Sequence, residues 1–297
     1  MAAKTYPGGV PAAAVPPHSR PSLEAMVGWR GGVLAAMFAS ACGCCCADAQ
    51  EHQSGAVPCG GETVARGTVS RIIDGRTFVL DDGREVRLAG IEVPSLLAPG
   101  GAGAKDALDA LTGGDDVVLR RAEIPKDRYG RLVGYAYAVR DGDELFTQGE
   151  MISSGFARVG GDVGIRACSV DLLGREGSAR RAKLGLWADS YYVTLHAETP
   201  AEVLAQRGRF ALVEGRVVSV RESGATIYVN FGRRWSEDFA VTILKRNARR
   251  FAAAGLDVQG LAGRRVRVRG WIEERGAGGS PHIEADHPEQ IEVDDRN

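Results

Sequence analysis

The residues best suited to chemistry in this chain are arginines and carboxylates that recur at short intervals. Arg76, Arg87 and Arg131 each offer a planar guanidinium, whose paired N–H donors match the oxygens of a phosphate group. Asp74 and Glu92 offer carboxylate oxygens, which are the donors that Ca²⁺ prefers. These residue types together indicate a site that handles phosphate.

The elements that carry these residues are predicted to be short strands. Apolar and polar residues alternate in three runs, at residues 68–72, 77–80 and 86–91. Asp-Gly pairs separate the runs, and the second pair is typical of a hairpin turn. If Asp74 and Arg76 lie in one strand, their side chains share a face of the sheet.

Helical spacing then alternates with strand patterns. Helices are expected at residues 104–112, 145–155 and 171–186, and strands at residues 117–121 and 133–139. Together with the preceding strands, this order fits a small β-barrel with helices packed on it.

A second series of strands begins near residue 209. Two runs around a Ser223-Gly224 turn precede a strand at residues 238–244, a helix near residues 245–254 and strands within residues 264–274 and 282–293. This is the order of a five-stranded Greek-key barrel of the OB type. The predicted fold class is therefore mainly β with packed helices (α+β), arranged as two tandem five-stranded OB-like β-barrels.

The predicted domain plan has six parts. They are a disordered extension at residues 1–25, a signal peptide at 26–49, a linker at 50–63, a first barrel domain at 64–192, a helical linker at 193–208 and a second OB-fold domain at 209–293. The extension is rich in Ala, Pro and Gly and has few side chains able to fill a core.

The predicted signal peptide indicates an exported protein. Met26 is followed by an arginine, an apolar run and the small-x-small pattern Ala47-Asp48-Ala49, so translation starts at either Met1 or Met26. After cleavage the protein would be secreted or periplasmic, whereas a retained or lipidated signal would anchor it in a membrane. No integral membrane domain is expected beyond this segment.

Charge and cysteine content narrow the expected partners. The 297 residues carry a net charge of -1, so a nucleic-acid partner needs a local basic patch rather than a broadly cationic surface. Of the six cysteines, four lie in the predicted signal peptide, and Cys59 and Cys168 would remain after cleavage. An oxidising compartment favours a disulfide between these two, and a pair of free thiols is the alternative.

Residues 64–192 resemble the staphylococcal nuclease (thermonuclease) family. Four short motifs in order carry the resemblance: Ile73-Asp74-Gly75-x-Thr77, Arg87-Leu88 followed by Ile91-x-x-Pro94, Asp127-x-Tyr129-Gly130-Arg131, and Gly185-Leu186-Trp187. The segment at residues 215–293 is similar to an OB-type nucleic-acid-binding module that accompanies some secreted members of the family.

The resemblance implies a Ca²⁺-dependent phosphodiesterase site in which several residues have changed. In the family, two aspartates hold Ca²⁺ beside the phosphate, a glutamate activates water and two arginines neutralise charge. The arginines correspond to Arg87 and Arg131, and the second aspartate corresponds to Glu92. The first aspartate is replaced by Arg76, and the general-base glutamate is replaced by Ser95.

These replacements predict phosphate binding with hydrolysis lost or very slow, because loss of a general base costs about 10²- to 10⁴-fold and Ca²⁺ needs several carboxylates. Two alternatives stay open. One is an active Ca²⁺-dependent nuclease with rearranged carboxylates, such as Asp74 with Glu92, and the other is an interaction module of the cell envelope. Arg87 and Arg131 could also be ordinary strand residues paired with Glu92 and Asp127.

The second domain carries a nucleic-acid contact candidate of its own. Arg233, Arg234 and Trp235 follow a predicted strand, and an aromatic ring beside arginines suits single-stranded DNA or RNA, where bases stack and phosphates need neutralising. Glu237 and Asp238 dilute this charge, so a solvated face is the alternative. With the three arginines of the first domain, these residues predict binding to nucleic acid or another polyanion.

Overall fold

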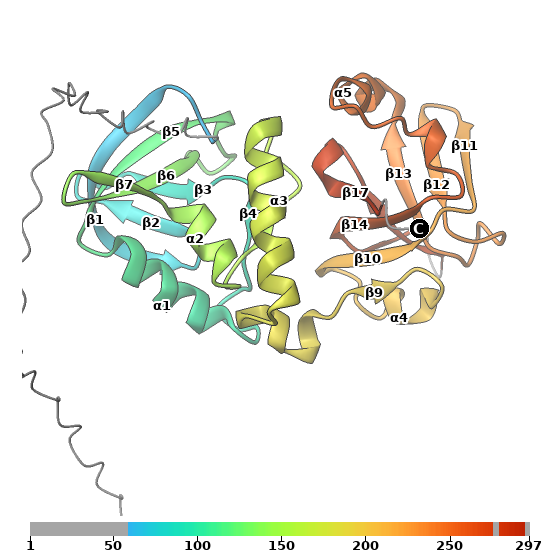
Figure 1. Ribbon diagram of the computed structural model, residues 1–297, viewed down its shortest axis with the longest axis horizontal. Coiled ribbons are helices and arrows are strands. Elements are labelled where there is room, and N and C mark those ends of the chain that lie inside the picture. The colour runs from blue at the N-terminus through green and yellow to red at the C-terminus, as the bar shows by residue number, and fades with distance from the viewer. Residues whose placement is uncertain (1–58, 276–278, 295–297) are drawn as a thin grey trace, which may run out of the picture. The chain divides into compact units, whose positions relative to one another are not determined.

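The computed structural model describes residues 59–275 and 279–294, and all of them belong to one unit, Ser54–Asn297 (Figure 1). The predicted extension and signal peptide at residues 1–49, and most of the predicted linker, lie outside the described residues. Among the described residues, none of the helices has the length and apolar composition required to span a bilayer. The division into a first and a second barrel domain stays a prediction.

The first sheet carries most of the predicted phosphate-handling residues. Its six strands are β1 (Thr63–Asp74), β2 (Thr77–Leu80), β3 (Glu85–Leu88), β5 (Asp116–Lys126), β6 (Leu132–Arg140) and β7 (Asp143–Phe146), in the order β3-β2-β1-β5-β6-β7. The start of β6 also pairs in parallel with β3, which makes the sheet partly ring-like. Two short strands, β4 (Ile91–Glu92) and β8 (Arg158–Val159), pair with each other outside this sheet.

Three helices pack beside the first sheet. They are α1 (Gly101–Thr112), α2 (Thr147–Ser153) and α3 (Arg166–Arg181), and α2 lies between the other two (Figure 1). The residues of α1 that face the core recur every three or four positions: Gly101, Ala104, Leu108 and Thr112. Two 3₁₀ turns, η1 (Gly185–Ala188) and η2 (Ser190–Tyr192), follow α3.

The structure corrects the limits of two predicted helices. The first residues of the helix predicted at 145–155 extend strand β7, and α2 ends at Ser153. The helix predicted at 171–186 starts earlier, at Arg166, and ends at Arg181. It ends there because Lys183 and Gly185 adopt φ values of 53° and 50°, which a right-handed helix cannot continue.

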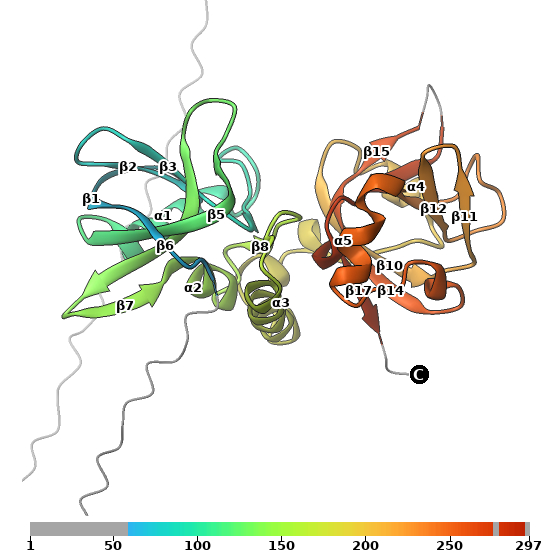
Figure 2. The same ribbon diagram turned by 90° about the horizontal axis from the view of Figure 1, so that it is seen from above.

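The later strands form two further sheets. One contains β9 (Leu195–His196), β10 (Phe210–Arg216), β14 (Arg265–Trp271) and β17 (Ile291–Asp294), in the order β17-β14-β10-β9. The other contains β11 (Ser219–Ser223), β12 (Thr226–Asn230), β13 (Ala240–Leu244), β15 (Glu273–Glu274) and β16 (Pro281–Glu284). Figures 1 and 2 both show β10, β14 and β17 side by side.

Short helical segments connect these later strands. They are α4 (Pro200–Leu204), η3 (Lys245–Asn247), α5 (Ala248–Ala253), η4 (Gln259–Leu261) and η5 (Pro288–Gln290). The protein is thus mainly β with some helices, as the sequence predicted. Closure of the strands into two five-stranded barrels stays a prediction, because the later strands pair as two separate sheets.

Two hydrophobic cores lie under these sheets. The first includes Phe78, Leu88 and Tyr135, and the second includes Phe239 and Phe251. All five rings or side chains are buried. Folding removes these large apolar side chains from water, which stabilises both cores.

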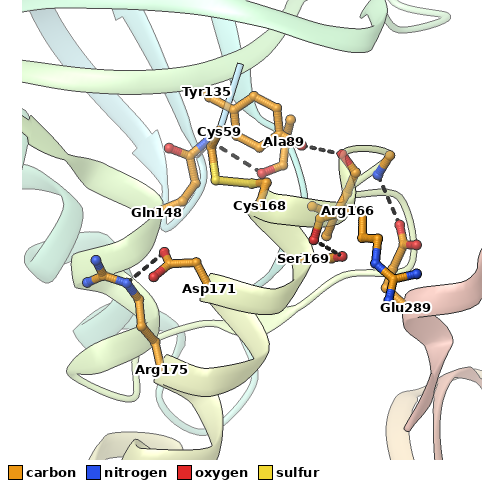
Figure 3. The surroundings of a disulfide bond; sticks show 12 residues. Cys59, Ala89, Tyr135, Gln148, Arg166, Cys168, Ser169, Asp171, Arg175 and Glu289 are labelled. Carbon is orange, nitrogen blue, oxygen red and sulfur yellow. Dashed lines mark hydrogen bonds and ion pairs between the residues drawn. A yellow bond between two sulfur atoms is a disulfide. The ribbon is translucent and has the colours of Figure 1, made fainter. Parts of the chain in front are cut away.

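A disulfide joins Cys59, just before β1, to Cys168 in the first turn of α3 (Figure 3). Both cysteines are fully buried, next to Tyr135 and Gln148. The backbone carbonyl of Cys59 also accepts a hydrogen bond of 2.7 Å from the hydroxyl of Tyr137. The bond fixes the beginning of the first sheet to α3, and the pairing expected from the sequence is present.

A buried ion pair links α3 to the later strands. Arg269 on β14 is fully buried and donates to both carboxylate oxygens of Glu176 on α3, at 2.9 and 2.8 Å. It also donates to the carbonyl of Val159 on β8, at 3.2 Å, and to Glu292 on β17. Burial acts to lower the pKa of Arg269, but the two carboxylates outweigh burial and raise it. The charges are therefore retained inside the protein.

Removing the disulfide should destabilise the fold. The bond closes a loop across 109 residues, so we expect the double variant Cys59→Ala, Cys168→Ala to lose about 2–5 kcal/mol of unfolding free energy. Chemical denaturation followed by circular dichroism measures this loss. Wild-type protein treated with a reductant is the control and should unfold like the variant. Equal stability of the oxidised wild type and the variant would contradict the expectation.

The buried network also predicts how stability depends on pH. Burial acts to raise the pKa of Glu292, but Arg269 and Arg267 outweigh burial and lower it. Between the ordinary glutamate pKa of about 4.3 and this lower value, the unfolded chain binds a proton that the folded chain does not. Stability therefore falls as pH drops through this window.

Glu292→Gln removes this proton linkage. We expect the variant to be less stable at neutral pH and to lose less stability on acidification below about pH 4.3, with a slope smaller by up to about 1.4 kcal/mol per pH unit. Denaturant titrations at a series of pH values measure the slope. The matched control is Glu85→Gln at an exposed position, which should follow the wild type. Identical slopes for Glu292→Gln and the wild type would refute the linkage.

Candidate functional site

A cleft of about 890 Å³ gathers the arginines that the sequence singled out. Arg76, Arg87, Glu92 and Arg131 all line it. These side chains come from the turn before β2, from β3, from β4 and from the residue before β6. The fold thus brings residues that are up to 55 positions apart, from 76 to 131, to one cavity.

Arg76 lies in the turn between β1 and β2 rather than within a strand. Its backbone N–H donates to the Asp74 carboxylate at 2.9 Å, which is the side-chain-to-backbone bond of an Asx turn. A Cβ at Gly75 would lie 2.7 Å from the Cβ of Ala104 on α1, so only glycine fits there. The close packing of the turn against α1 therefore sets the position of Arg76, and the strand-face rule does not apply.

Arg76 forms an ion pair with Glu92, and both side chains are largely buried. The Nη1 group donates to Glu92 Oε2 and, at 3.4 Å, to the carbonyl of Ile91. Burial raises the pKa of Glu92, and the charges of Arg76, Arg87 and Arg158 oppose this rise. The carboxylate that the resemblance assigns to Ca²⁺ is thus engaged by a guanidinium.

Arg87 faces the cleft from β3 without a hydrogen bond or salt bridge to any of the described residues. Its strand position is fixed by pairing with Thr77 on β2 and Val133 on β6. Burial lowers the pKa of Arg87, and the like charge of Arg76 lowers it further. The sequence left open a salt bridge between Arg87 and Glu92, and the structure does not contain it. A half-buried cation with no contacting anion favours an anionic ligand.

Arg131 is held by a local turn. Its Nε group donates to Asp127 Oδ2 at 2.7 Å, and its Nη2 group lies at the same distance in an ion pair. This is the pairing with Asp127 that the sequence left open as an alternative for Arg131. Asp127 Oδ1 accepts from the backbone N–H groups of Tyr129 and Arg131, at 2.9 and 3.1 Å, and Gly130 adopts a φ of 81°. The Tyr129 ring is 68% exposed and lies 5.3 Å from the Arg131 guanidinium. An aromatic face and a guanidinium thus adjoin at the rim of the cleft.

The cleft also has acidic residues at the end formed by the later strands. Glu273, Glu284 and Asp286 line it together with Trp271. Burial raises the pKa of Glu284, and the negative charges of Asp286 and Glu273 raise it further. The cleft therefore carries both cationic and anionic side chains, and a polyanion is attracted by the arginines and repelled by the carboxylates.

Ser95 and Asp74 line a neighbouring cavity rather than this cleft. Ser95 is exposed, and its carbonyl accepts a hydrogen bond of 2.9 Å from Ala98 in the loop after β4. Among the described residues, no carboxylate or imidazole is hydrogen-bonded to the Ser95 hydroxyl. Nothing at this position can therefore take a proton from water in the way a glutamate would.

The residues at the site of the family's calcium ion do not suit Ca²⁺. Position 76 holds a cation, and its guanidinium contacts the Glu92 carboxylate directly. Asp74 is bonded to the backbone of the turn. Within residues 59–275 and 279–294, no group of three or more His, Cys, Asp or Glu side chains is arranged to hold a metal ion. Ca²⁺ needs six to eight oxygen donors, and these residues do not supply them.

Arg233, Arg234 and Trp235 lie elsewhere, in the loop after β12, and do not line the cleft. Arg234 pairs with Glu237 at 2.6 Å and with Asp238 at 3.8 Å, which matches the solvated-face alternative. The Trp235 ring is 72% exposed and is available to stack on a base. These residues form a second, separate candidate contact.

The sequence patterns did not identify three residues that line these two cavities. Trp271 lines the cleft at the end of β14, and Arg158 and Arg209 line the neighbouring cavity. Arg158 stands in a short apolar stretch, and Trp271 and Arg209 lie far along the chain from the motifs. Only the pairing of distant strands brings them to the site, so no local pattern marks them.

The fold and the cleft together define a mainly β protein with an arginine-lined cavity suited to oxyanions. Residues 85–189 match the model of a protein family described as staphylococcal nuclease homologue. The chain therefore contains a domain of this family, as the sequence motifs indicated, and the family supports a nucleic-acid-related function. A comparison with curated proteins found no match.

Exchanging the guanidinium for a carboxylate should improve metal binding. Arg76→Asp places a second carboxylate beside Glu92 and frees Glu92 from its ion pair, so we expect Ca²⁺ to bind at least about tenfold more tightly than to the wild type. Isothermal titration calorimetry measures this affinity. Arg71→Asp makes the same charge change at an exposed position of β1 and is the control. Equal Ca²⁺ affinity in both variants would contradict the assignment of position 76.

Proposed function

We propose that the protein binds nucleic acid, or another phosphate polyanion, through Arg76, Arg87 and Arg131, with phosphodiester hydrolysis lost or very weak. The observation that carries the proposal is the ion pair between Arg76 and Glu92. It places a cation at the position where the resemblance to the family predicts a metal-binding carboxylate. A guanidinium can still neutralise and orient a phosphate.

Binding is supported by the state of Arg87. Among the described residues it has no contacting anion, and it shares the cleft with two further arginines. Phosphate oxygens would offset the like-charge repulsion between Arg76 and Arg87 and would accept hydrogen bonds from both. The exposed ring of Tyr129 beside Arg131 adds a surface on which a base can stack.

Weak or absent hydrolysis is supported by two positions. Ser95 has no partner that could make it a base, and loss of a general base costs about 10²- to 10⁴-fold. Glu92, the carboxylate that corresponds to a metal ligand in the resemblance, is held by Arg76. Water activation and metal-assisted charge neutralisation both lack their residues, whereas the phosphate-binding arginines are retained.

The acidic residues of the cleft favour a short or flexible strand over a long duplex. Glu273, Glu284 and Asp286 repel phosphates that approach them, so a ligand must place its phosphates at the arginines. We propose that the segments at residues 64–192 and 209–293 act as two OB-type barrels, the second contributing Trp235 to a single-stranded ligand.

Export is part of the same proposal. A disulfide such as Cys59–Cys168 persists in oxidising compartments and is rare in the cytosol. This bond supports the secreted or periplasmic location that the signal-like segment at residues 26–49 predicts. Nucleic acid or an anionic polymer of the cell surface would meet the protein there.

Retention and cleavage of oligonucleotides test the proposal together. Labelled DNA and RNA strands are incubated with the protein, with and without Ca²⁺, and both complex formation and product release are followed. Salt-sensitive retention without cleavage is expected. Rapid Ca²⁺-dependent cleavage that Glu92→Gln abolishes would establish the active-nuclease alternative instead. Neither retention nor cleavage would favour an interaction module of the envelope.

The contribution of Arg87 can be measured separately. The charge of Arg87 is not paired within the described part of the chain. Arg87→Gln should therefore weaken strand binding about tenfold at low salt and lower the number of counterions released on binding by about one. The control is Arg140→Gln, because Arg140 pairs with Asp115 at 2.6 Å and does not line the cleft. Fluorescence anisotropy at several salt concentrations gives both quantities. Equal effects of the two substitutions would refute the role of Arg87.

A further inference from the structure

A second cavity lies beside the Arg76–Glu92 ion pair and has its own positive charge. Its volume is about 390 Å³, within the range of small-molecule sites. Arg158 and Arg209 line it, together with the aromatic residues Tyr191 and Trp271. Neither arginine lines the cleft described above, although Arg76, Glu92, Phe210 and Trp271 line both cavities.

Arg158 is a buried cation without an ion-pair partner. The residue is only 6% exposed, and its guanidinium lies 5.1 Å from the centre of the Tyr192 ring and 5.0 Å from that of Phe210. Its Nη1 group donates to the carbonyl of Phe210 at 2.9 Å, and its Nε group has no hydrogen-bond partner. No carboxylate of the described residues forms a salt bridge with it. A buried charge of this kind is costly unless an anion accompanies it.

Arg209 is held over the same cavity in a similar way. Its guanidinium lies 3.4 Å from the centre of the Tyr191 ring, and its Nη2 group donates to the carbonyl of Tyr191 at 2.8 Å. The Nη1 group donates to the side-chain oxygen of Gln206. Within the described part of the chain, Arg209 also lacks a salt bridge. Both guanidiniums are thus oriented by carbonyls and rings rather than by a salt bridge, and the negative charges of Glu92 and Glu176 act on Arg158 without a salt bridge to it.

The carboxylates that line the cavity are already engaged. Glu92 is paired with Arg76, and Asp74 accepts the backbone N–H of the turn. The two unpaired cations therefore leave the cavity with a net attraction for an anion. Tyr191 and Trp271 add aromatic surface, which suits a flat ring attached to that anion.

We propose that this cavity is a second ligand site, which binds the phosphate group of a nucleotide through Arg158 and Arg209. The base or sugar contacts Tyr191 and Trp271. Arg76, Glu92 and Trp271 also line the cleft, whereas Arg158 and Arg209 do not, so substitution of Arg209 distinguishes this site from polymer binding through Arg87 and Arg131. The nucleotide is either free in solution or the end of a strand, because the recognised chemistry is the same.

Titration of the full chain with adenosine 5′-monophosphate, adenosine and inorganic phosphate tests the site. We expect the monophosphate to bind at least about tenfold more tightly than adenosine, because only the former supplies the anion. Isothermal titration calorimetry measures each affinity. Equal affinity for adenosine and the monophosphate would overturn the proposal.

Substitution of Arg209 tests the location. Arg209→Gln should weaken monophosphate binding about tenfold, and Arg207→Gln is the matched control, because Arg207 is the neighbouring arginine, pairs with Glu274 and does not line the cavity. Circular dichroism checks that each variant is folded. Arg209 is chosen because Arg158 is more deeply buried and its substitution would disturb the fold more. Binding that survives Arg209→Gln but is lost in Arg87→Gln would place the ligand in the cleft and refute the proposal.

Competition identifies the source of the phosphate. A dinucleotide with a 5′-phosphate that displaces the monophosphate, when the same dinucleotide without the phosphate does not, shows that the site accepts a strand end. Displacement by pyrophosphate but by neither dinucleotide shows a site for soluble phosphates and nucleotides. Each of these results supports the second site. Displacement by both dinucleotides alike would refute phosphate recognition.

Discussion

The buried ion pair between Arg269 and Glu176 is the constraint on which the rest of the structure depends. Neither side chain is exposed, so each charge needs a compensating partner inside the protein, and Arg269 also pairs with Glu292 and Glu176 with Arg180. The same guanidinium contacts the carbonyl of Val159 on β8, and β8 pairs with β4, where Glu92 lies. One interaction thereby connects α3, β14 and β17 to the strand that carries the central carboxylate of the site. Removing either partner would leave the other buried charge with one remaining ion pair, to Glu292 or to Arg180.

The Arg76–Glu92 pair then decides the electrostatic character of the site. In the family that the domain at residues 85–189 matches, the motif resemblance calls for two carboxylates here. This chain instead has one carboxylate bound by a guanidinium, with Arg87 and Arg131 in the same cleft. Local charge therefore favours phosphate oxygens over a divalent cation. Such an exchange separates two properties that a nuclease normally combines, because phosphate binding needs positive charge and water activation needs a base.

The two cavities that Arg76 and Glu92 both line differ in how their charge is balanced. The cleft contains arginines together with Glu273, Glu284 and Asp286, so cations and anions share its lining. In the smaller cavity, Arg158 and Arg209 are oriented by carbonyls and aromatic rings rather than by carboxylates. Guanidiniums held in this way keep their charge available, since a ring or a carbonyl compensates less charge than a carboxylate does. Under the proposals above, a polymer and a nucleotide would occupy adjoining cavities that share Arg76, Glu92, Phe210 and Trp271.

The sequence by itself determined what depends on near neighbours along the chain. The strand runs, the mainly β class, the Asp127 turn that holds Arg131 and the family motifs are all local patterns, because turn formation and side-chain alternation act over a few residues. Helix limits were less certain: α3 ends at Arg181 because of the left-handed residues that follow it. Only the tertiary structure decided the partners of the charges. Arg76 meets Glu92 across 16 positions and Arg269 meets Glu176 across 93, and the placement of Arg158 and Arg209 in one cavity follows from which strands pair. Ion pairing depends on distance in space and on burial, and neither quantity can be obtained from residue order alone.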